Sequence, residues 1–148
     1  MNTEDFKRKY GHEEDGFWYP RVTAICEIIA KPGMERWLAD SGSYEGMMKK
    51  RRKVLDWGSA IDKAVKRLFK KESPEINSEI SPSIEAFLTW LGKNKIELFD
   101  ADRKVVSKRH FYAGTTDIIA EINGKFGILD IKTSSNFWDE HFVQTAAY

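Results

Sequence analysis

The sequence predicts an α/β domain in which a small, mixed or antiparallel central sheet is flanked by helices. Before residue 92, apolar residues recur every three or four positions, as the buried face of a helix requires. From residue 96 the period shortens to two, which is typical of strands, and Asn123-Gly124 is the strongest short-range signal for a two-residue hairpin turn. Helices, then a strand meander, then a final helix together indicate the α/β class.

The individual elements follow from local signals along the chain. Residues 1–19 are charged and show no period, so we expect a flexible N-terminal arm ahead of one domain over residues 20–148. Helical spacing bounded by proline or glycine predicts helices over residues 24–30, 34–39, 59–71 and 82–91. Strands are expected over residues 96–99, 104–107, 111–122 and 125–133, followed by a last helix over residues 137–148.

Length and composition exclude several classes of protein. The chain has 148 residues, enough for one domain, and its 41% apolar content with five tryptophans favours a packed globule over disorder. No apolar run approaches the roughly 18 residues of a membrane span, and the first residues lack the hydrophobic core of a secretion signal. The single cysteine, Cys26, excludes an internal disulfide and a cysteine-ligated iron–sulfur cluster. We therefore expect a cytoplasmic protein that does not contact membranes.

A net charge of +1 hides an uneven distribution of charge. Residues 49–71 contain ten basic and two acidic residues, a local balance of +8. Such a stripe is typical of a protein with a polyanionic partner, although a solvated helix face has the same composition. The residues at the start of the stripe that we expect to contact a nucleic-acid backbone are Lys49, Lys50, Arg51 and Arg52.

The predicted hairpin brings two carboxylates together. A two-residue turn at Asn123-Gly124 sets the register of the strands so that Asp117 lies directly opposite Asp130. Cβ atoms of such a pair are about 4.5–5.5 Å apart, and Lys132 follows on the same face two residues later. The residues of the opposite face are apolar and predict a core: Ile118, Ala120, Ile122, Leu129 and Ile131.

Two carboxylates at this separation repel each other unless a cation lies between them, and a hard divalent cation prefers such oxygen ligands. A metal with open coordination positions can bind a phosphate oxygen and lower the pKa of bound water. Lys132 could then position that water or stabilise charge that develops at phosphorus. The alternative is a surface Asp–Asp–Lys cluster that pairs with other side chains, and the residues alone leave both interpretations open.

The same residues resemble a known family. Asp117 followed by residues 130–132 (DIK) looks like the PD-(D/E)XK nuclease signature. Residues 114–117 (GTTD), 129–133 (LDIKT) and 144–148 (QTAAY), in this order and spacing, resemble its RecB-like branch, which includes mitochondrial single-strand exonucleases and CRISPR-adaptation nucleases. Residues 19–25 (YPRVTAI) are similar to the entry of that branch, so the resemblance covers most of the chain.

The resemblance implies a restriction-endonuclease-like core and a metal-dependent deoxyribonuclease, more specifically an exonuclease that acts on single strands or ends. It implies catalytic roles for Asp117, Asp130 and Lys132, and a Mg²⁺ or Mn²⁺ ion held by Asp117, Asp130 and the backbone carbonyl of Ile131. A bacterial or phage-encoded protein is expected, with replication, recombination, repair and phage DNA processing as open settings.

Gln144 and Tyr148 are expected to contact substrate. Residues at i and i+4 lie on one face of a helix, so both side chains can reach the site or an incoming strand. The alternative for this pair is a helix that packs its tyrosine on the sheet.

Two departures from the family pattern matter. Asp62 stands where the family has a metal-binding histidine; it is an acceptable ligand for a hard ion, but an exposed acid paired with Lys66 at i+4, or a degenerate site, is the alternative. Asp102 is the nearest match to a family glutamate ahead of the first motif strand and is a candidate site residue.

The sequence ends at Tyr148, where family members continue, so we expect a fold that is incomplete at its C-terminus, either because the chain is truncated or because a partner chain or oligomer completes it.

Three functions compete. The leading one is a metal-dependent deoxyribonuclease whose partner is DNA. The second is a catalytically inactive nucleic-acid-binding module of the same fold, for which the Asp62 substitution and the early end of the sequence are the grounds. The third is an unrelated metal-dependent or structural domain in which the hairpin geometry is accidental.

Overall fold

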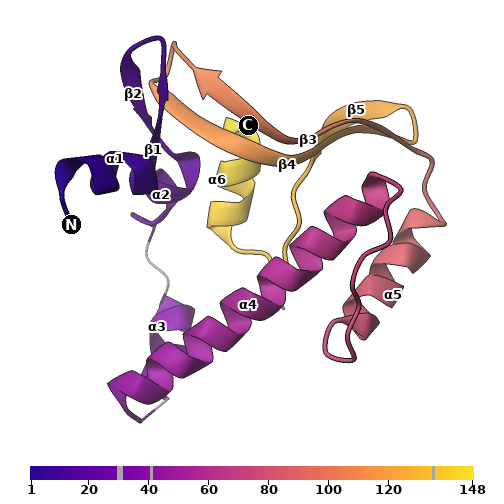
Figure 1. Ribbon diagram of the computed structural model, residues 1–148, viewed down its shortest axis with the longest axis horizontal. Helices are drawn as coiled ribbons and strands as arrows, with labels where there is room; N and C mark the ends of the chain where they lie inside the picture. The colour runs from indigo at the N-terminus through magenta and orange to yellow at the C-terminus, as the bar shows by residue number, and fades with distance from the viewer. Residues whose placement is uncertain (30–31, 41, 135) are drawn as a thin grey trace.

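Figure 1 shows a mixed α/β architecture, which confirms the predicted α/β class. The computed structural model describes residues 1–29, 32–40, 42–134 and 136–148. Within these ranges the chain forms six helices and two antiparallel sheets. The helices are α1 (Thr3–Tyr10), α2 (Val22–Cys26), α3 (Pro32–Ala39), α4 (Tyr44–Phe69), α5 (Ser81–Leu91) and α6 (Asp139–Ala147). The strands are β1 (Gly11–Glu14), β2 (Phe17–Pro20), β3 (Ile96–Ser107), β4 (Tyr112–Ile122) and β5 (Lys125–Leu129).

The expectation of a loose arm over residues 1–19 was wrong, because this segment forms α1 and the β1–β2 hairpin. Asp15 and Gly16 make the turn with positive φ angles of 50° and 78°. The hairpin packs on the larger sheet, where Lys104 Nζ lies 2.6 Å from Glu14 Oε2 and Tyr19 is only 3% exposed. The Asp-Gly turn signal is present in the sequence, but the flanking strands lack the apolar alternation that normally accompanies it.

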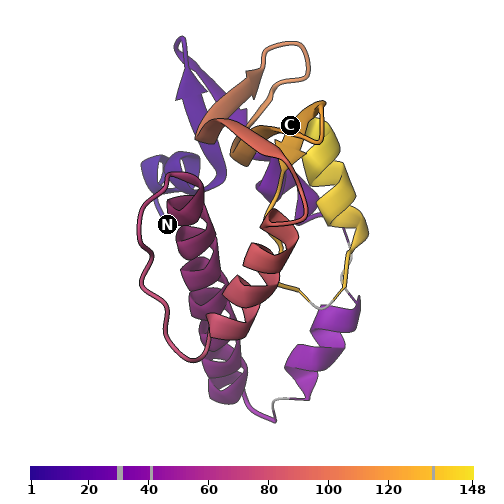
Figure 2. The same ribbon diagram turned by 90° about the vertical axis from the view of Figure 1, so that its right-hand side faces the viewer.

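Helix α4 begins at Tyr44, fifteen residues before the expected start at Ser59. Its N-cap is Ser43, whose side chain accepts a hydrogen bond from the Gly46 amide at 3.0 Å. The second half buries the predicted apolar face of α4 in the core. The first half extends away from the sheet toward α3 (Figures 1 and 2), and its large apolar residues, among them Met48, Val54 and Leu55, stay exposed.

The larger sheet has the strand order β3-β4-β5, and its hairpin has the predicted register. Ile122 pairs with Lys125 and Ile118 with Leu129. Asn123 and Gly124 have φ angles of 51° and 80°, as a type I′ turn requires. The register prediction is therefore confirmed along the whole paired length of β4 and β5.

Two strand boundaries differ from expectation. β3 is one strand over Ile96–Ser107, not two short ones. A shift of register between Leu98 and Asp100 lets the pairing with β4 continue through the segment where a break between two strands was expected. β5 ends at Leu129, before residues 130–133, because the side-chain carboxylate of Asp117 accepts the Ile131 amide at 2.9 Å in place of a strand partner. The DIK residues therefore follow the strand end directly.

The core lies between β4, the second half of α4, and α5, which runs beside α4 in Figure 2. Its buried members are Ile61, Ala64, Val65, Ile80, Ile84, Ile118 and Ala120. The predicted core face of the hairpin is confirmed, since Ile122, Leu129 and Ile131 pack against this cluster. α2 ends at Cys26, ahead of the expected end at residue 30, which lies outside the described residues. Among the described residues, no helix combines the length and hydropathy needed to span a bilayer.

Replacing Ile84 by Ala is expected to lower the free energy of unfolding by about 2–5 kcal/mol, because the deletion leaves a cavity in a packed core. Ile84 is 1% exposed, whereas Ile28 is 84% exposed and makes Ile28→Ala the matched control, with an expected change within about 0.5 kcal/mol. Urea denaturation of both variants measures the difference. Equal losses in the two variants would contradict the assignment of the core.

Candidate functional site

Three carboxylates from separate elements meet around one ammonium group. The Nζ atom of Lys66, on α4, lies 3.1 Å from Asp62 Oδ2, one turn earlier on the same helix. It also lies 2.7 Å from Asp102 Oδ1 on β3 and 3.1 Å from Asp117 Oδ1 on β4. The Lys66 side chain is 13% exposed. Sequence motifs had pointed to all three acids, and the structure brings them together.

The strand register explains why Asp102 joins this cluster. Ala101 pairs with Ile118 and Arg103 with Thr116, so Asp102 lies opposite Asp117 on the neighbouring strand. Its backbone is in the left-handed region, at φ 58°, which aspartate tolerates better than most residues. The carboxylates of Asp62 and Asp117 are bonded to the same nitrogen, and so lie within twice 3.1 Å of each other.

The pairing of Asp62 with Lys66 is confirmed, and the role of Asp62 as a metal ligand stays a prediction. It pairs with Lys66 at i+4, as the alternative held, but it does so inside the site and next to Asp117. Burial raises the pKa of Asp62, and its bond with Lys66 opposes that shift without cancelling it. Burial alone would lower the pKa of Lys66, but its hydrogen bonds to Asp102 and Asp62 and the charge of Asp117 raise it well above its ordinary value.

A second network surrounds Asp130, whose side chain is 7% exposed. Lys132 Nζ lies 2.5 Å from Asp130 Oδ2 and donates to Gln144 Oε1 at 3.0 Å. The Gln144 amide nitrogen donates to Asp130 Oδ1 and to the Tyr148 hydroxyl, each at 3.2 Å. Gln144 and Tyr148 thus lie on one face at the end of the chain, and Gln144 contacts both Asp130 and Lys132.

Gly114 is what allows Tyr148 to lie here. A Cβ atom added to Gly114 would come 2.3 Å from Tyr148 Cε1, so only glycine leaves room for the ring. The adjacent Tyr112 hydroxyl donates to the Ala147 carbonyl at 2.9 Å and ties the end of α6 to β4. The packing alternative for Tyr148 is therefore also realised, together with its contact to the site. Burial raises the pKa of the Tyr148 hydroxyl, although its hydrogen bond with Gln144 acts in the opposite direction.

Asp117 links the two networks. One of its oxygens accepts from Lys66 at 3.1 Å and the other accepts the Ile131 amide at 2.9 Å, one residue beyond Asp130. The predicted pairing of Asp117 with Asp130 continues the register of Ile118 and Leu129 by one step, but the two carboxylates bond to different lysines. The role of the Ile131 carbonyl stays a prediction.

The donor set is suited to a hard cation. Four aspartates, Asp62, Asp102, Asp117 and Asp130, pair with three lysines, Lys66, Lys70 and Lys132, which leaves one carboxylate in excess and oxygen ligands of the kind that a hard cation prefers. Within the part of the chain that the structure describes, no group of three or more His, Cys, Asp or Glu side chains is arranged to hold a metal ion. The ammonium of Lys66 lies at the centre of these carboxylates instead.

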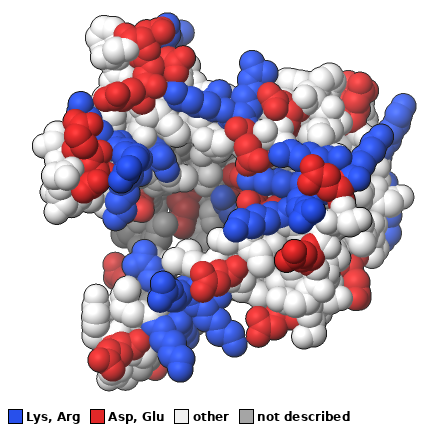
Figure 3. All heavy atoms as spheres, in the orientation of Figure 1, with Lys and Arg blue, Asp and Glu red and all other residues white. Residues whose placement is uncertain are grey.

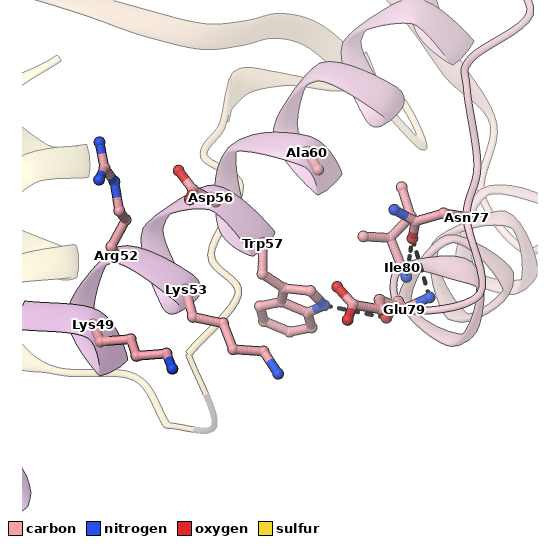
Figure 4. A pocket seen from close by; sticks show the side chains of 9 residues that line it. All are labelled: Lys49, Arg52, Lys53, Asp56, Trp57, Ala60, Asn77, Glu79 and Ile80. Carbon is pink, nitrogen blue, oxygen red and sulfur yellow. Dashed lines mark hydrogen bonds between the residues drawn. The ribbon is translucent and has the colours of Figure 1, made fainter. Parts of the chain in front are cut away.

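Two adjoining grooves run along α4. The first, about 700 Å³, extends from Asp56 to Lys70 and has Asp62, Lys66 and Asp102 in its wall. The second, about 430 Å³, contains Lys49, Arg52, Lys53 and Trp57, which Figure 4 shows on one side with Asn77, Glu79 and Ile80 across from them. Asp56 and Ala60 line both grooves, so the two are continuous. We call the groove with Lys49, Arg52 and Lys53 the basic groove, and the one with Asp62 and Asp102 the acidic groove.

The basic stripe is only partly where the sequence placed it. Lys49 lies thirteen residues before Asp62, about 20 Å along a helix, so the charges lie in the neighbouring groove and not at the acidic cluster itself. Lys49 and Arg52 line that groove, whereas Arg51 is exposed outside its lining. Lys53, the next residue of the basic stripe, lines it too. In Figure 3, Lys and Arg side chains gather along α4 with carboxylates between them.

The residue that sequence reasoning placed least well is Lys66. It belonged to the basic stripe by composition, yet it is bonded to three carboxylates, and its i+4 spacing from Asp62 was the available signal. Trp57 is held by its indole N–H, which donates to the Glu79 carbonyl at 3.2 Å, and it packs against the core.

A scan against models of protein families and a search of curated proteins find no match to this chain. What this protein does is therefore inferred from the geometry and chemistry of the described residues.

Gly114→Ala is expected to destabilise the protein by about 1–3 kcal/mol, because the new methyl group overpacks against Tyr148. Gly127→Ala is the matched control, since nothing lies within 4 Å of a Cβ added there on the adjacent strand. Chemical denaturation compares the two variants. In a Tyr148→Ala background the cost of Gly114→Ala should fall sharply, and an unchanged cost would show that the ring is not what excludes a side chain at 114.

Proposed function

We propose that this protein is a metal-dependent nuclease that hydrolyses phosphodiester bonds of DNA. In this proposal, the β3–β5 sheet with α4 and α6 is a restriction-endonuclease-like core. The observation that carries the proposal is the meeting of Asp62, Asp102 and Asp117 around one cation, beside the Asp130–Lys132–Gln144 network. A surface cluster that merely pairs charges does not need carboxylates from one helix and two strands, or a link through the Ile131 amide.

Asp117 and Asp130 are proposed to hold Mg²⁺ or Mn²⁺, with Asp62 and the Ile131 carbonyl as further ligands. Carboxylate and carbonyl oxygens are the ligands that these hard ions prefer. When bound, the ion would supply charge stabilisation at a phosphate oxygen and would lower the pKa of bound water.

In this proposal, Lys132 stabilises charge on the substrate and Gln144 positions Lys132. The ammonium of Lys132 is fixed between Asp130 and Gln144, so its donors are oriented before a substrate arrives. An ammonium held in this way stabilises negative charge that develops on a phosphate oxygen. Gln144 in turn is oriented by hydrogen bonds to Tyr148 and Asp130. Gln144 and Tyr148 are therefore positioning groups for Lys132.

The basic groove supports a polyanion such as DNA as the partner, and a single strand or an end is proposed as the reacting part. Lys49, Arg52 and Lys53 provide positive charge for a phosphate backbone, and the groove continues into the acidic one along α4. The second candidate function is a nucleic-acid-binding module without catalysis, which the central position of Lys66 among the carboxylates favours.

The first test is digestion of end-labelled linear and circular DNA, single- and double-stranded, with Mg²⁺, Mn²⁺ or EDTA. We expect cleavage of linear single strands with either metal and none with EDTA. Asp117→Asn and Lys132→Met should each lower the cleavage rate by about a hundredfold or more, because they remove a metal ligand and a charge-stabilising donor.

The control for this test is Asp15→Asn, a change of the same type at the β1–β2 turn, whose positive φ of 50° asparagine also adopts. It should cleave at the parental rate. Parental cleavage by Asp117→Asn would refute the assignment of the site, and salt-sensitive DNA binding without cleavage in either metal would favour the binding module.

The basic groove makes a separate prediction about affinity. Changing Lys49, Arg52 and Lys53 together to Gln should weaken DNA binding and reduce the slope of log affinity against log salt by about one for each lost phosphate contact. The cleavage rate at saturating DNA should stay near that of the parent, since these residues do not touch the acidic cluster. Fluorescence anisotropy over a salt series measures both affinity and slope.

The matched control replaces Lys93, Lys95 and Lys125, three exposed lysines that line neither groove, by Gln. It removes the same charge from another place. An equal loss of affinity in both triple variants would mean that the groove contributes only through the overall charge of the protein.

A further inference from the structure

Lys66 and Asp102 are charged groups of the site to which the proposed function gives no role. The side chain of Lys66 is more buried than those of its three carboxylate partners, at 13% exposed against 34% for Asp62, 48% for Asp102 and 23% for Asp117. Its ammonium lies among the oxygens that the proposal offers to a metal. The ammonium and a divalent cation therefore compete for the same ligands.

We propose that Lys66 is a built-in counter-cation that sets the metal affinity of this site, and that Asp102 is its retaining partner and not a metal ligand. This inference rests on the proposed function, because it concerns the same carboxylates. It assigns to Lys66 and Asp102 a role in metal exchange, whereas Asp62 and Asp117 remain the ligands.

The charges explain why a counter-cation is needed. Three carboxylates that share one point of contact repel each other strongly in a partly buried site, and one ammonium offsets much of that repulsion. Lys66 therefore keeps Asp62 and Asp117 in place before a metal arrives. The same contact weakens metal binding, because the ammonium must leave these two oxygens when a divalent cation takes them.

The geometry indicates where the ammonium goes. Asp102 makes the shortest contact with Lys66, 2.7 Å against 3.1 Å for the other two, and it is the most exposed of the three. It also lies 3.8 Å from Lys70, which places it at the cationic rim of the acidic groove. Asp102 can keep the Lys66 ammonium at this rim while the more buried Asp62 and Asp117 turn to the metal.

The test is calorimetric titration of Mn²⁺ alone into the metal-free full chain, without nucleic acid. Lys66→Met removes the charge but keeps the apolar stem, and we expect it to bind Mn²⁺ about tenfold or more tightly than the parent. Lys66→Arg keeps the charge and should show no gain. Lys63→Met removes an exposed lysine from the same helix and groove, and its affinity should change far less than that of Lys66→Met.

A double-mutant cycle separates the two roles of Asp102. If Asp102 retains Lys66, then Asp102→Asn weakens Mn²⁺ binding in the parent, because the ammonium stays on Asp62 and Asp117, and has little effect in the Lys66→Met background. If Asp102 is itself a ligand, Asp102→Asn weakens binding in both backgrounds, which would overturn its assignment as a retaining partner.

Thermal melting monitored by circular dichroism controls for folding. Without metal, Lys66→Met should melt at a lower temperature than the parent, and Mn²⁺ should raise its melting temperature by more than that of the parent. If Lys66→Met does not fold, Lys66→Gln replaces it, since the amide still donates to a carboxylate without charge. Equal Mn²⁺ affinity in the parent and the neutral variant overturns the role of Lys66 alone. No Mn²⁺ binding by either folded protein overturns the metal site, and with it the proposed function.

Discussion

Repulsion among aspartates is the constraint on which the arrangement of this protein depends. The β3–β4 register sets Asp102 beside Asp117, and Asp130 directly follows Leu129, which pairs with Ile118 next to Asp117. Such a group of carboxylates is unstable without cations. The second half of α4 therefore does more than cover the core, because it also carries Lys66 to the oxygens of Asp117. Packing and charge compensation here are properties of the same helix.

The negative charge of Asp130 is compensated by residues near the C-terminal end of the chain. Asp130 is compensated by Lys132, and Gln144 joins the two through its amide group. This arrangement requires α6 to dock closely on β4, which the missing side chain of Gly114 permits. Gly114 is thus a packing residue of β4, and it acts on the site through Tyr148.

Cations line both grooves along α4, and carboxylates are mixed with them. The first half of the helix presents Lys49, Arg52 and Lys53 in one groove, and the second half presents Asp62 in the next, together with four cations, Lys63, Lys66, Arg67 and Lys70. The cations attract a polyanion, and the carboxylates repel it unless a bound cation neutralises them. This mixture gives a physical reason why nucleic-acid binding and metal binding would depend on each other in this protein, and it follows from one continuous helix of 26 residues.

The sequence by itself determined what short-range signals control. Asn123-Gly124 specified the turn, the turn specified the register, and alternation then specified that Ile118 faces the core while Asp117 and Asp130 end the paired strands. Only the tertiary structure decided that Lys66 joins Asp117, a residue 51 positions away, and that the β1–β2 hairpin packs on the larger sheet. The reason is that a turn or a helix cap is a contact between near neighbours in the chain. The partner of a charged side chain, by contrast, is chosen by how distant elements pack, and composition alone placed Lys66 in a basic stripe.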